Sequence, residues 1–106
     1  MKLKFKNTEG TKYTVKFRKP DGRTWGVNCD GVCFFPKGLL NESHIVVNPH
    51  RTDQTIFNTI IHEVGHAFFE DKTEREITKF ANTLSRLLFN NLQFRSSDLQ
   101  QLIRED

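Results

Sequence analysis

The sequence has no run of apolar residues approaching the ~20 that a membrane-spanning helix needs, so we expect no transmembrane segment. Residues 1–6 alternate charged and apolar side chains, which is not the pattern of a signal peptide. Only two cysteines are present, and a pair of thiols without an export signal fits a reducing compartment. We therefore expect a cytoplasmic protein that does not bind membranes.

The two cysteines, Cys29 and Cys33, have the spacing C-x-x-x-C. No second cysteine pair exists to complete a structural zinc site with them. We expect two ordinary thiols at strand ends. A disulfide across the intervening turn, or a redox role, is the alternative.

The chain is short for an enzyme, with 106 residues. This length suits one domain over residues 1–106 and leaves little room for a deep substrate pocket. The 16 basic and 13 acidic residues give a net charge of +3, a mild bias that does not by itself select a partner. No basic-aromatic platform or recognition helix stands out. The sequence therefore favours a protein or peptide partner over nucleic acid, and a monomer or weak dimer.

Five short segments alternate or are rich in β-formers, and they predict strands at 3–6, 12–18, 25–28, 32–35 and 44–48. Turn residues at 7–10 predict a hairpin between the first two, and Asp30-Gly31 predicts a tight turn between the next two. Because Pro49 ends the last segment, we place that strand near the sheet edge, where an extended peptide can bind through main-chain hydrogen bonds. The N-terminal part is thus predicted to be a small antiparallel or mixed sheet.

The most informative stretch is His62-Glu63-Val64-Gly65-His66, which matches the H-E-x-x-H pattern of zinc peptidases. On a helix, residues four apart lie about 40° apart and one turn along, so His62 and His66 can bind one metal ion. Glu63 is about 100° from His62 and can face the open side of the metal as a general base. A residue as small as Gly65 would let another backbone approach beside the ligands.

This helix is predicted to begin at a cap, Thr52 or Asp53, and to end near 70–72. Its apolar residues fall on one broad face roughly opposite the histidines. They are Phe57, Ile60, Ile61, Val64 and Phe68. We therefore expect a helix with a core side and a chemistry side.

Two further helices follow in the sequence. Thr73 and Glu76 form a capping box, T-x-x-E, at the start of the second, and the short connection predicts an antiparallel helix pair. The apolar stripe of this helix is Ile77, Phe80, Ala81, Leu84 and Leu88. Ser96 or Ser97 can cap a short third helix over 98–104, packed on the sheet or on the second helix. The fold class is therefore α+β: a small N-terminal sheet, a metal-binding helix, an antiparallel second helix and a short C-terminal helix.

A catalytic zinc usually takes three protein ligands and leaves one position for water. Besides His62 and His66, the third ligand could be Glu70, Asp71, Glu74, Glu76 or a histidine from elsewhere in the chain. The sequence pattern alone does not choose among them.

Residues 60–88 resemble the ImmA/IrrE-type metallopeptidases, which belong to the gluzincins. Members of that family carry a helix pattern like E-x-x-A-[ND]-x-F-A-x-x-L after the zinc helix, and residues 74–84 are similar to it, with Phe80-Ala81 at the F-A position. Ile77 stands where Ala is usual, and Thr78 where Asn or Asp is usual. The resemblance implies a zincin-like fold, a Zn²⁺ cofactor and Glu74 as the third ligand, with Glu76 as the alternative.

These expectations combine into a zinc-dependent endopeptidase in which Glu63 activates a zinc-bound water for attack on a peptide bond. The alternative is a zinc-binding regulatory or interaction domain with little or no peptidase activity. An oxyanion donor is usually also needed. Tyr13, His44, His50 and Arg75 are candidates by their chemistry, and the sequence does not choose among them.

Overall fold

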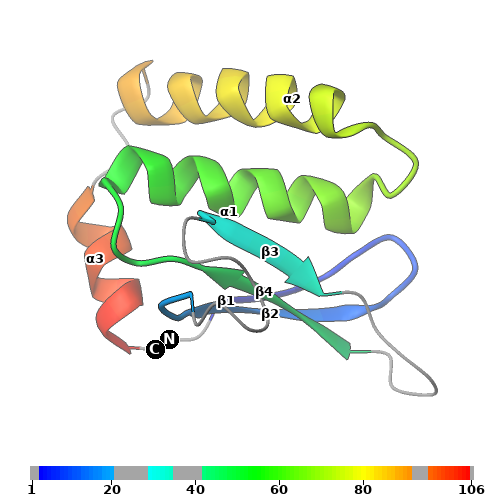
Figure 1. Ribbon diagram of the computed structural model, residues 1–106, viewed down its shortest axis with the longest axis horizontal. Coiled ribbons are helices and arrows are strands. Elements are labelled where there is room, and N and C mark those ends of the chain that lie inside the picture. The colour runs from blue at the N-terminus through cyan, green and yellow to red at the C-terminus, as the bar shows by residue number, and fades with distance from the viewer. Residues whose placement is uncertain (1–2, 21–28, 35–41, 92–95, 106) are drawn as a thin grey trace.

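A computed structural model describes residues 3–20, 29–34, 42–91 and 96–105 of the chain. Its elements are β1 (Leu3–Lys6), β2 (Lys12–Phe17), β3 (Gly31–Phe34), β4 (Glu42–Val47), α1 (Asp53–Phe68), α2 (Glu74–Arg86), a π-helical turn (Leu87–Asn91) and α3 (Ser96–Glu105). Figure 1 shows α1 lying on one face of the sheet and α2 lying over α1 on the side away from the sheet. The fold is α+β, as the sequence predicts.

The four strands form one mixed sheet in the order β1-β2-β4-β3. The β1–β2 and β3–β4 pairs are antiparallel, whereas β2 and β4 run parallel. The predicted hairpin of the first two strands is therefore confirmed. Its turn contains Gly10, whose φ of 80° is in the left-handed region that glycine adopts without strain. The strand predicted at 25–28 lies outside the described residues.

The prediction that residues 44–48 lie near the sheet edge is wrong. β4 pairs with β2 on one side and with β3 on the other, and Ile45 and Val47 are 0% exposed. Pro49 follows the strand rather than interrupting it, so it removes no hydrogen bond from the ladder and says nothing about the edge. Among the described strands, β3 is the one that ends the sheet on the side of β4.

The turn predicted at Asp30-Gly31 is also wrong in part, because Gly31 is the first residue of β3. A Cβ built on Gly31 would lie 2.5 Å from Thr59 Cγ2 of α1 and 3.1 Å from the Val46 carbonyl oxygen. Glycine is therefore needed here for close contact between the strand and the helix rather than for a tight turn.

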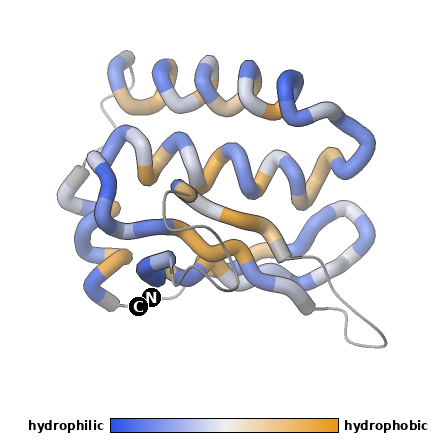
Figure 2. Tube along the Cα trace, viewed as in Figure 1, coloured by the Kyte–Doolittle hydropathy of each residue, from blue (hydrophilic) through white to orange (hydrophobic). Residues whose placement is uncertain are grey.

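The core lies between the sheet and α1. Alternate residues of β2 and β4 point toward the helix, and they include Tyr13, Val15, Ile45 and Val47. Figure 2 shows apolar stretches on the sheet facing apolar turns of α1. Because α2 covers the other side of α1, that helix is enclosed from two sides.

The predicted core face of α1 is partly correct. Phe57, Ile60 and Val64 pack against the core, but Phe68 is 38% exposed. Both the sheet and α2 bury parts of the helix, so the side that carries the histidines is not fully exposed. Glu63, on that side, is buried.

The predicted caps of α1 and α2 are confirmed, whereas α3 begins at Ser96 itself, so Ser96 and Ser97 lie inside the helix that they were expected to precede. The Thr52 hydroxyl accepts a hydrogen bond from the Thr55 amide, and the Thr73 hydroxyl accepts one from the Glu76 amide. The first helix ends at Phe68, slightly before the predicted 70–72. The five residues from 69 to 73 then reverse the chain, so α2 runs back antiparallel along α1 (Figure 1).

The third helix packs at the start of α1. Leu99 is 2% exposed and belongs to the main core, with Leu102 and Ile103 packed against it. The Gln100 side-chain amide donates a hydrogen bond to the Asp53 carboxylate, so α1, not α2, is the helix that α3 is bonded to. In the part of the chain that the structure describes, no helix is long and apolar enough to cross a membrane.

Candidate metal centre

The α1–α2 helix pair brings together the two histidines and one of the four acidic candidates. Glu74 Oε1 lies 2.7 Å from His62 Nε2, and Glu74 Oε2 lies 2.7 Å from His66 Nε2. The two Nε2 atoms are 3.1 Å apart. Both rings therefore point at the same carboxylate, and these three residues form the metal-competent cluster found among the described residues.

The three side chains fit a zinc ion by donor type and by spacing. Two imidazole nitrogens and one carboxylate oxygen are a usual protein ligand set for catalytic zinc, which keeps a fourth position open. With metal–ligand distances of about 2.0–2.1 Å, tetrahedral ligand atoms lie roughly 3.3 Å apart. The observed separations of 2.7–3.1 Å are a few tenths of an ångström shorter. Small rotations of the side chains would open the cluster to the size of the ion.

The cluster is open on the side of α2. The side chains of His62 and His66 are 18% and 22% exposed, whereas that of Glu74 is 69% exposed. Glu70, Asp71 and Glu76, the other acidic candidates, are exposed and lie outside the cluster. Glu76 sits in the first turn of α2, where its charge favours the helix N-terminus.

The predicted general base, Glu63, lies beside the cluster and is 8% exposed. Burial, and secondly the negative charge of Glu74, raises the pKa of the Glu63 carboxyl from 4.5 to about 7. A carboxyl group with a pKa near neutrality is suited to taking up and returning a proton. Glu63 is therefore a buried carboxyl beside the cluster, and its role as a general base stays a prediction.

A cavity of about 260 Å³ adjoins the cluster. It is lined by Cys29, Asp30, Gly31, Asn58, Thr59, His62, Glu63 and Glu74. One wall is therefore the start of β3, and the opposite wall is the middle of α1. The close contact of Gly31 with Thr59 holds these two walls together at one end of the cavity.

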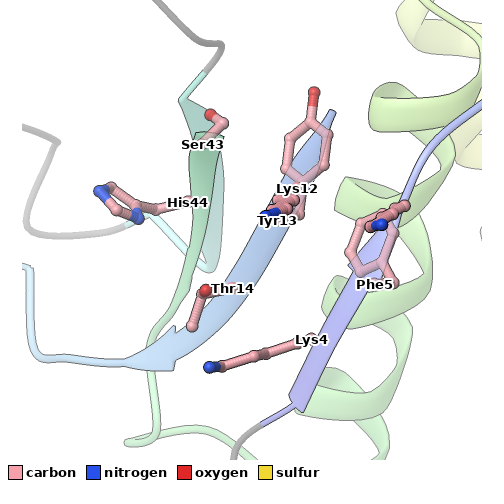
Figure 3. Close-up of a pocket in the computed structure, with 8 residues that line it drawn as sticks. Lys4, Phe5, Lys12, Tyr13, Thr14, Ser43 and His44 are labelled. Atoms are coloured by element: carbon pink, nitrogen blue, oxygen red, sulfur yellow. The ribbon is translucent and has the colours of Figure 1, made fainter. Parts of the chain in front are cut away.

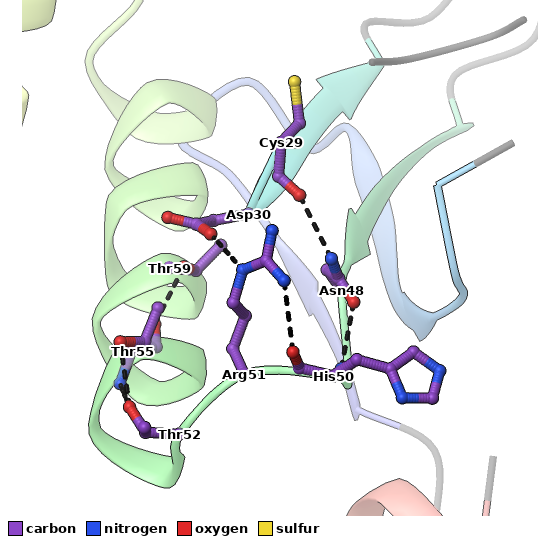
Figure 4. Close-up of polar contacts among 8 residues, drawn as sticks. All are labelled: Cys29, Asp30, Asn48, His50, Arg51, Thr52, Thr55 and Thr59. Carbon is purple, nitrogen blue, oxygen red and sulfur yellow. Dashed lines mark hydrogen bonds and ion pairs between the residues drawn. The ribbon is translucent and has the colours of Figure 1, made fainter. Parts of the chain in front are cut away.

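Polar contacts fix the segment that leads into β3, as Figure 4 shows. The Asn48 amide donates to the Asp30 carbonyl over 2.8 Å, and the Asn48 side chain donates to the Cys29 carbonyl over 3.3 Å. The Arg51 guanidinium forms an ion pair of 2.8 Å with the Asp30 carboxylate. The loop between β4 and α1 therefore positions the strand that borders the cavity.

The four residues suggested as oxyanion donors are not gathered at the cluster. Tyr13 is 1% exposed and its hydroxyl is buried, and burial raises its pKa to about 12. The His50 ring points away from α1 in Figure 4. His44 is exposed on the face of the sheet opposite to Tyr13, and Arg75 is exposed next to Glu74. None of the four lines the cavity beside the cluster.

A second hollow, of about 490 Å³, lies on the sheet, and Figure 3 shows its lining residues. Tyr13 and Ser43 are cross-strand neighbours whose hydroxyls point the same way, while Lys4, Thr14 and His44 occupy the other face. This hollow shares no lining residue with the cavity at the cluster. Its basic residues, Lys4, Lys6 and Lys12, thus lie away from the candidate metal cluster.

Asn7 was overlooked in the sequence, where it is part of a turn signal. Its side-chain oxygen accepts hydrogen bonds from the Thr11 and Glu9 amides. Its side-chain nitrogen donates a hydrogen bond of 3.0 Å to the Ala67 carbonyl at the end of α1. The hairpin thereby holds the helix one residue after His66. An Asn-x-x-Gly turn gives no sign of such a distant partner.

Cys29 and Cys33 are free thiols, as expected of ordinary strand-end cysteines. Comparison of the chain with protein-family models, with curated proteins and with solved structures finds no match.

Proposed function

We propose that the chain is a small zinc-dependent endopeptidase with a zincin-like fold, similar to the ImmA/IrrE-type metallopeptidases. His62, His66 and Glu74 would hold the zinc ion, and Glu63 would act as the general base. The observation that carries the proposal is the placement of both Glu74 oxygens 2.7 Å from the two histidine Nε2 atoms. Four candidate acids were available in the sequence, and the one implied by the family resemblance is the one at the histidines.

When bound, zinc would supply a Lewis acid that polarises the peptide carbonyl and makes water more acidic. The chain itself supplies the proton transfers. Glu63, with its pKa raised to about 7, would accept a proton from the attacking water and return it to the departing amide nitrogen. Because this carboxyl is 8% exposed, bulk water competes little for its proton.

The cavity of about 260 Å³ supplies a place for the peptide bond between β3 and α1. Among the described strands, β3 ends the sheet on this side, and such a strand can pair with an extended peptide through main-chain hydrogen bonds. The sequence places this role on the strand before the zinc helix. The observed strand order, with β4 inside the sheet, supports β3 for this role instead.

The experiment that tests the proposal compares the wild-type chain with Glu63→Gln, both loaded with zinc. We expect one zinc per chain in both proteins, cleavage of a mixed peptide library by the wild type, and at least a hundredfold slower cleavage by the variant, because general acid–base catalysis contributes roughly 10²–10⁴-fold. Equal cleavage by both proteins would show that Glu63 is not the base. Absence of stoichiometric zinc would refute the proposed metal site itself.

A zinc-binding interaction domain with little or no peptidase activity is the second candidate. The exposure of the Glu74 side chain, 69%, favours it, because a partner protein could reach the open side of the cluster. In that case both proteins would bind zinc and neither would cleave the library.

A further inference from the structure

Apart from the hollow on the sheet, a polar cavity of about 280 Å³ continues from the cavity at the metal cluster. We refer to it as the second cavity. The two share Asp30, Asn58 and Thr59 as lining residues. The second cavity extends between the first half of α1 and the last turns of α2, where it is lined by Asn82, Ser85 and Arg86. Together the two form a continuous trough that leads from the metal ligands toward the start of α1.

Polar groups in this second cavity are left with unused hydrogen-bonding capacity. The Asn58 side-chain nitrogen donates a hydrogen bond of 2.9 Å to the Asn82 side-chain oxygen across the two helices. This leaves the amide oxygen of Asn58 and the amide nitrogen of Asn82 for another partner. Ser85 is 1% exposed, and its hydroxyl has no hydrogen-bond partner among the described residues. A buried polar group without a hydrogen-bond partner costs folding free energy. A ligand that hydrogen-bonds to the Ser85 hydroxyl therefore gains binding free energy.

The charge that remains in the cavity is positive. Its acidic residue, Asp30, is paired with Arg51. Arg86 is exposed, and the structure shows no ion pair between it and any described residue. The neighbouring amide, hydroxyl and guanidinium groups are the ones that bind a carboxylate in proteins.

We infer that this second cavity binds an acidic side chain, Asp or Glu, of the peptide that the metal site cleaves; this inference rests on the proposed peptidase function. Arg86 is twelve residues beyond Glu74 on α2, which corresponds to about 18 Å at 1.5 Å per residue. An extended peptide advances roughly 3.3 Å per residue. The acidic residue therefore lies about five to six positions from the cleaved bond, and the chain selects substrates at that distance.

The test uses the zinc-loaded Glu63→Gln protein and fluorescein-labelled twelve-residue peptides of Ala, Ser, Thr and Gly. Each peptide carries one Glu, or one Gln at the same position. Fluorescence anisotropy should show about fivefold tighter binding for Glu at one position, the size expected of a partly exposed ion pair. Adding Arg86→Gln should abolish that preference, and Arg86→Lys should restore part of it.

Lys79→Gln is the matched control, because it removes one positive charge from the same helix but lines a different hollow. It should leave the preference for Glu unchanged. The inference is overturned when no position prefers Glu, or when the preference survives Arg86→Gln or is lost equally in Lys79→Gln.

Digestion of the same peptides by the wild-type protein separates this inference from the proposed function. We expect cleavage about five to six residues from the Glu. Binding that depends on Arg86 without any cleavage would support the acidic subsite and refute the peptidase. Cleavage at equal rates with Glu and Gln at every position would support the peptidase and refute the subsite.

Ser85→Ala supplies a second readout. Because the Ser85 hydroxyl has no partner in the peptide-free protein, its removal should leave the melting temperature unchanged or higher. Binding of the preferred Glu peptide should weaken about threefold, as expected for one hydrogen bond. A lower melting temperature with unchanged peptide binding would show that the hydroxyl has a structural role only and would count against the subsite.

Discussion

Gly65 of α1 faces the Ile77 side chain of α2 across the contact between the two helices. A Cβ on Gly65 would lie 3.3 Å from Ile77 Cγ2 and 3.8 Å from a ring carbon of Phe80. Gly65 stands between the two ligand histidines in the helix sequence, and Ile77 is one turn beyond Glu74. The size of the side chain at position 65 therefore controls how far the Glu74 carboxylate lies from the imidazoles.

Gly65→Val should weaken zinc binding by about tenfold to a hundredfold, the range seen when groups that orient metal ligands are disturbed. The extra methyl groups would push α2 outward and carry Glu74 away, while His62 and His66 stay on their own helix. Competition with a chromophoric chelator measures the affinity.

Two variants control this experiment. Gly65→Ala should be tolerated, because the helix propensity gained, about 1 kcal/mol, offsets a contact that is tight by only a few tenths of an ångström. Adding Ile77→Ala to Gly65→Val should restore most of the zinc affinity by making room. Equal affinity in Gly65→Val and the wild type would show that the helix spacing does not position Glu74.

The parts of the site that are local in sequence could be predicted from it. His62, Glu63 and His66 have their relative positions set by one helix, and Thr73 defines where the next helix begins. The short connection then limits Glu74 to the vicinity of His66. What helix geometry and a tight turn determine was therefore within reach of sequence reasoning.

The parts of the fold and of the site that depend on tertiary contacts could not be predicted from the sequence. Among the described strands, the edge position of β3 results from the insertion of β4 beside β2 in parallel, which no local pattern specifies. The burial of Glu63 results from contacts with other elements, since its own helix would leave it half exposed. Gly31 carries a signal, a glycine within a strand segment, that is consistent with close backbone contact, but Asp30 before it made a turn the more obvious interpretation.

Glu74→Gln and Glu76→Gln should separate the two candidates for the third ligand. Glu74→Gln replaces a charged ligand by a neutral amide and should lower zinc affinity about a hundredfold. Glu76→Gln should leave zinc affinity unchanged and cost about 0.5 kcal/mol of stability through the helix dipole. Isothermal titration with zinc and urea unfolding measure the two quantities. The reverse pattern would assign the metal to Glu76.

Cys33 should react slowly with iodoacetamide in the folded protein. Burial, then the charges of Glu63 and Glu70, raises the pKa of its thiol from 9.0 to about 12. At pH 8.5 a shift of this size leaves on the order of a thousandfold less thiolate, which is the reactive form. Because the folded state keeps its proton to higher pH than the unfolded state, this group stabilises the fold below pH 9 and its contribution is lost as the pH rises toward 12.

Mass spectrometry of Cys29→Ser, in which Cys33 is the remaining thiol, measures the rate of alkylation in the native protein and in about 8 M urea. We expect the native rate to be lower by up to about a thousandfold. Cys33→Ser is the matched control, because Cys29 is exposed and should react readily in both conditions. A native Cys33 that reacts as fast as the unfolded one would contradict the burial of this strand against α1.

Asn7→Ala should destabilise the protein by about 2 kcal/mol, because it leaves the Ala67 carbonyl and the Thr11 amide without their buried partner. Asn7→Asp is the sharper variant. It keeps the oxygen that accepts from Thr11 but loses the donor to Ala67, and it places a negative charge at the C-terminal end of α1, where the helix dipole is also negative.

We therefore expect Asn7→Asp to be at least as unstable as Asn7→Ala at pH 7. Below pH 4 the introduced carboxyl becomes protonated, loses its charge and gains a hydrogen that it can donate to the Ala67 carbonyl. Its stability relative to Asn7→Ala should then rise, as measured by urea unfolding of both variants at the two pH values. A constant difference between the variants across this range would mean that the hairpin turn does not bond to the helix end beside His66.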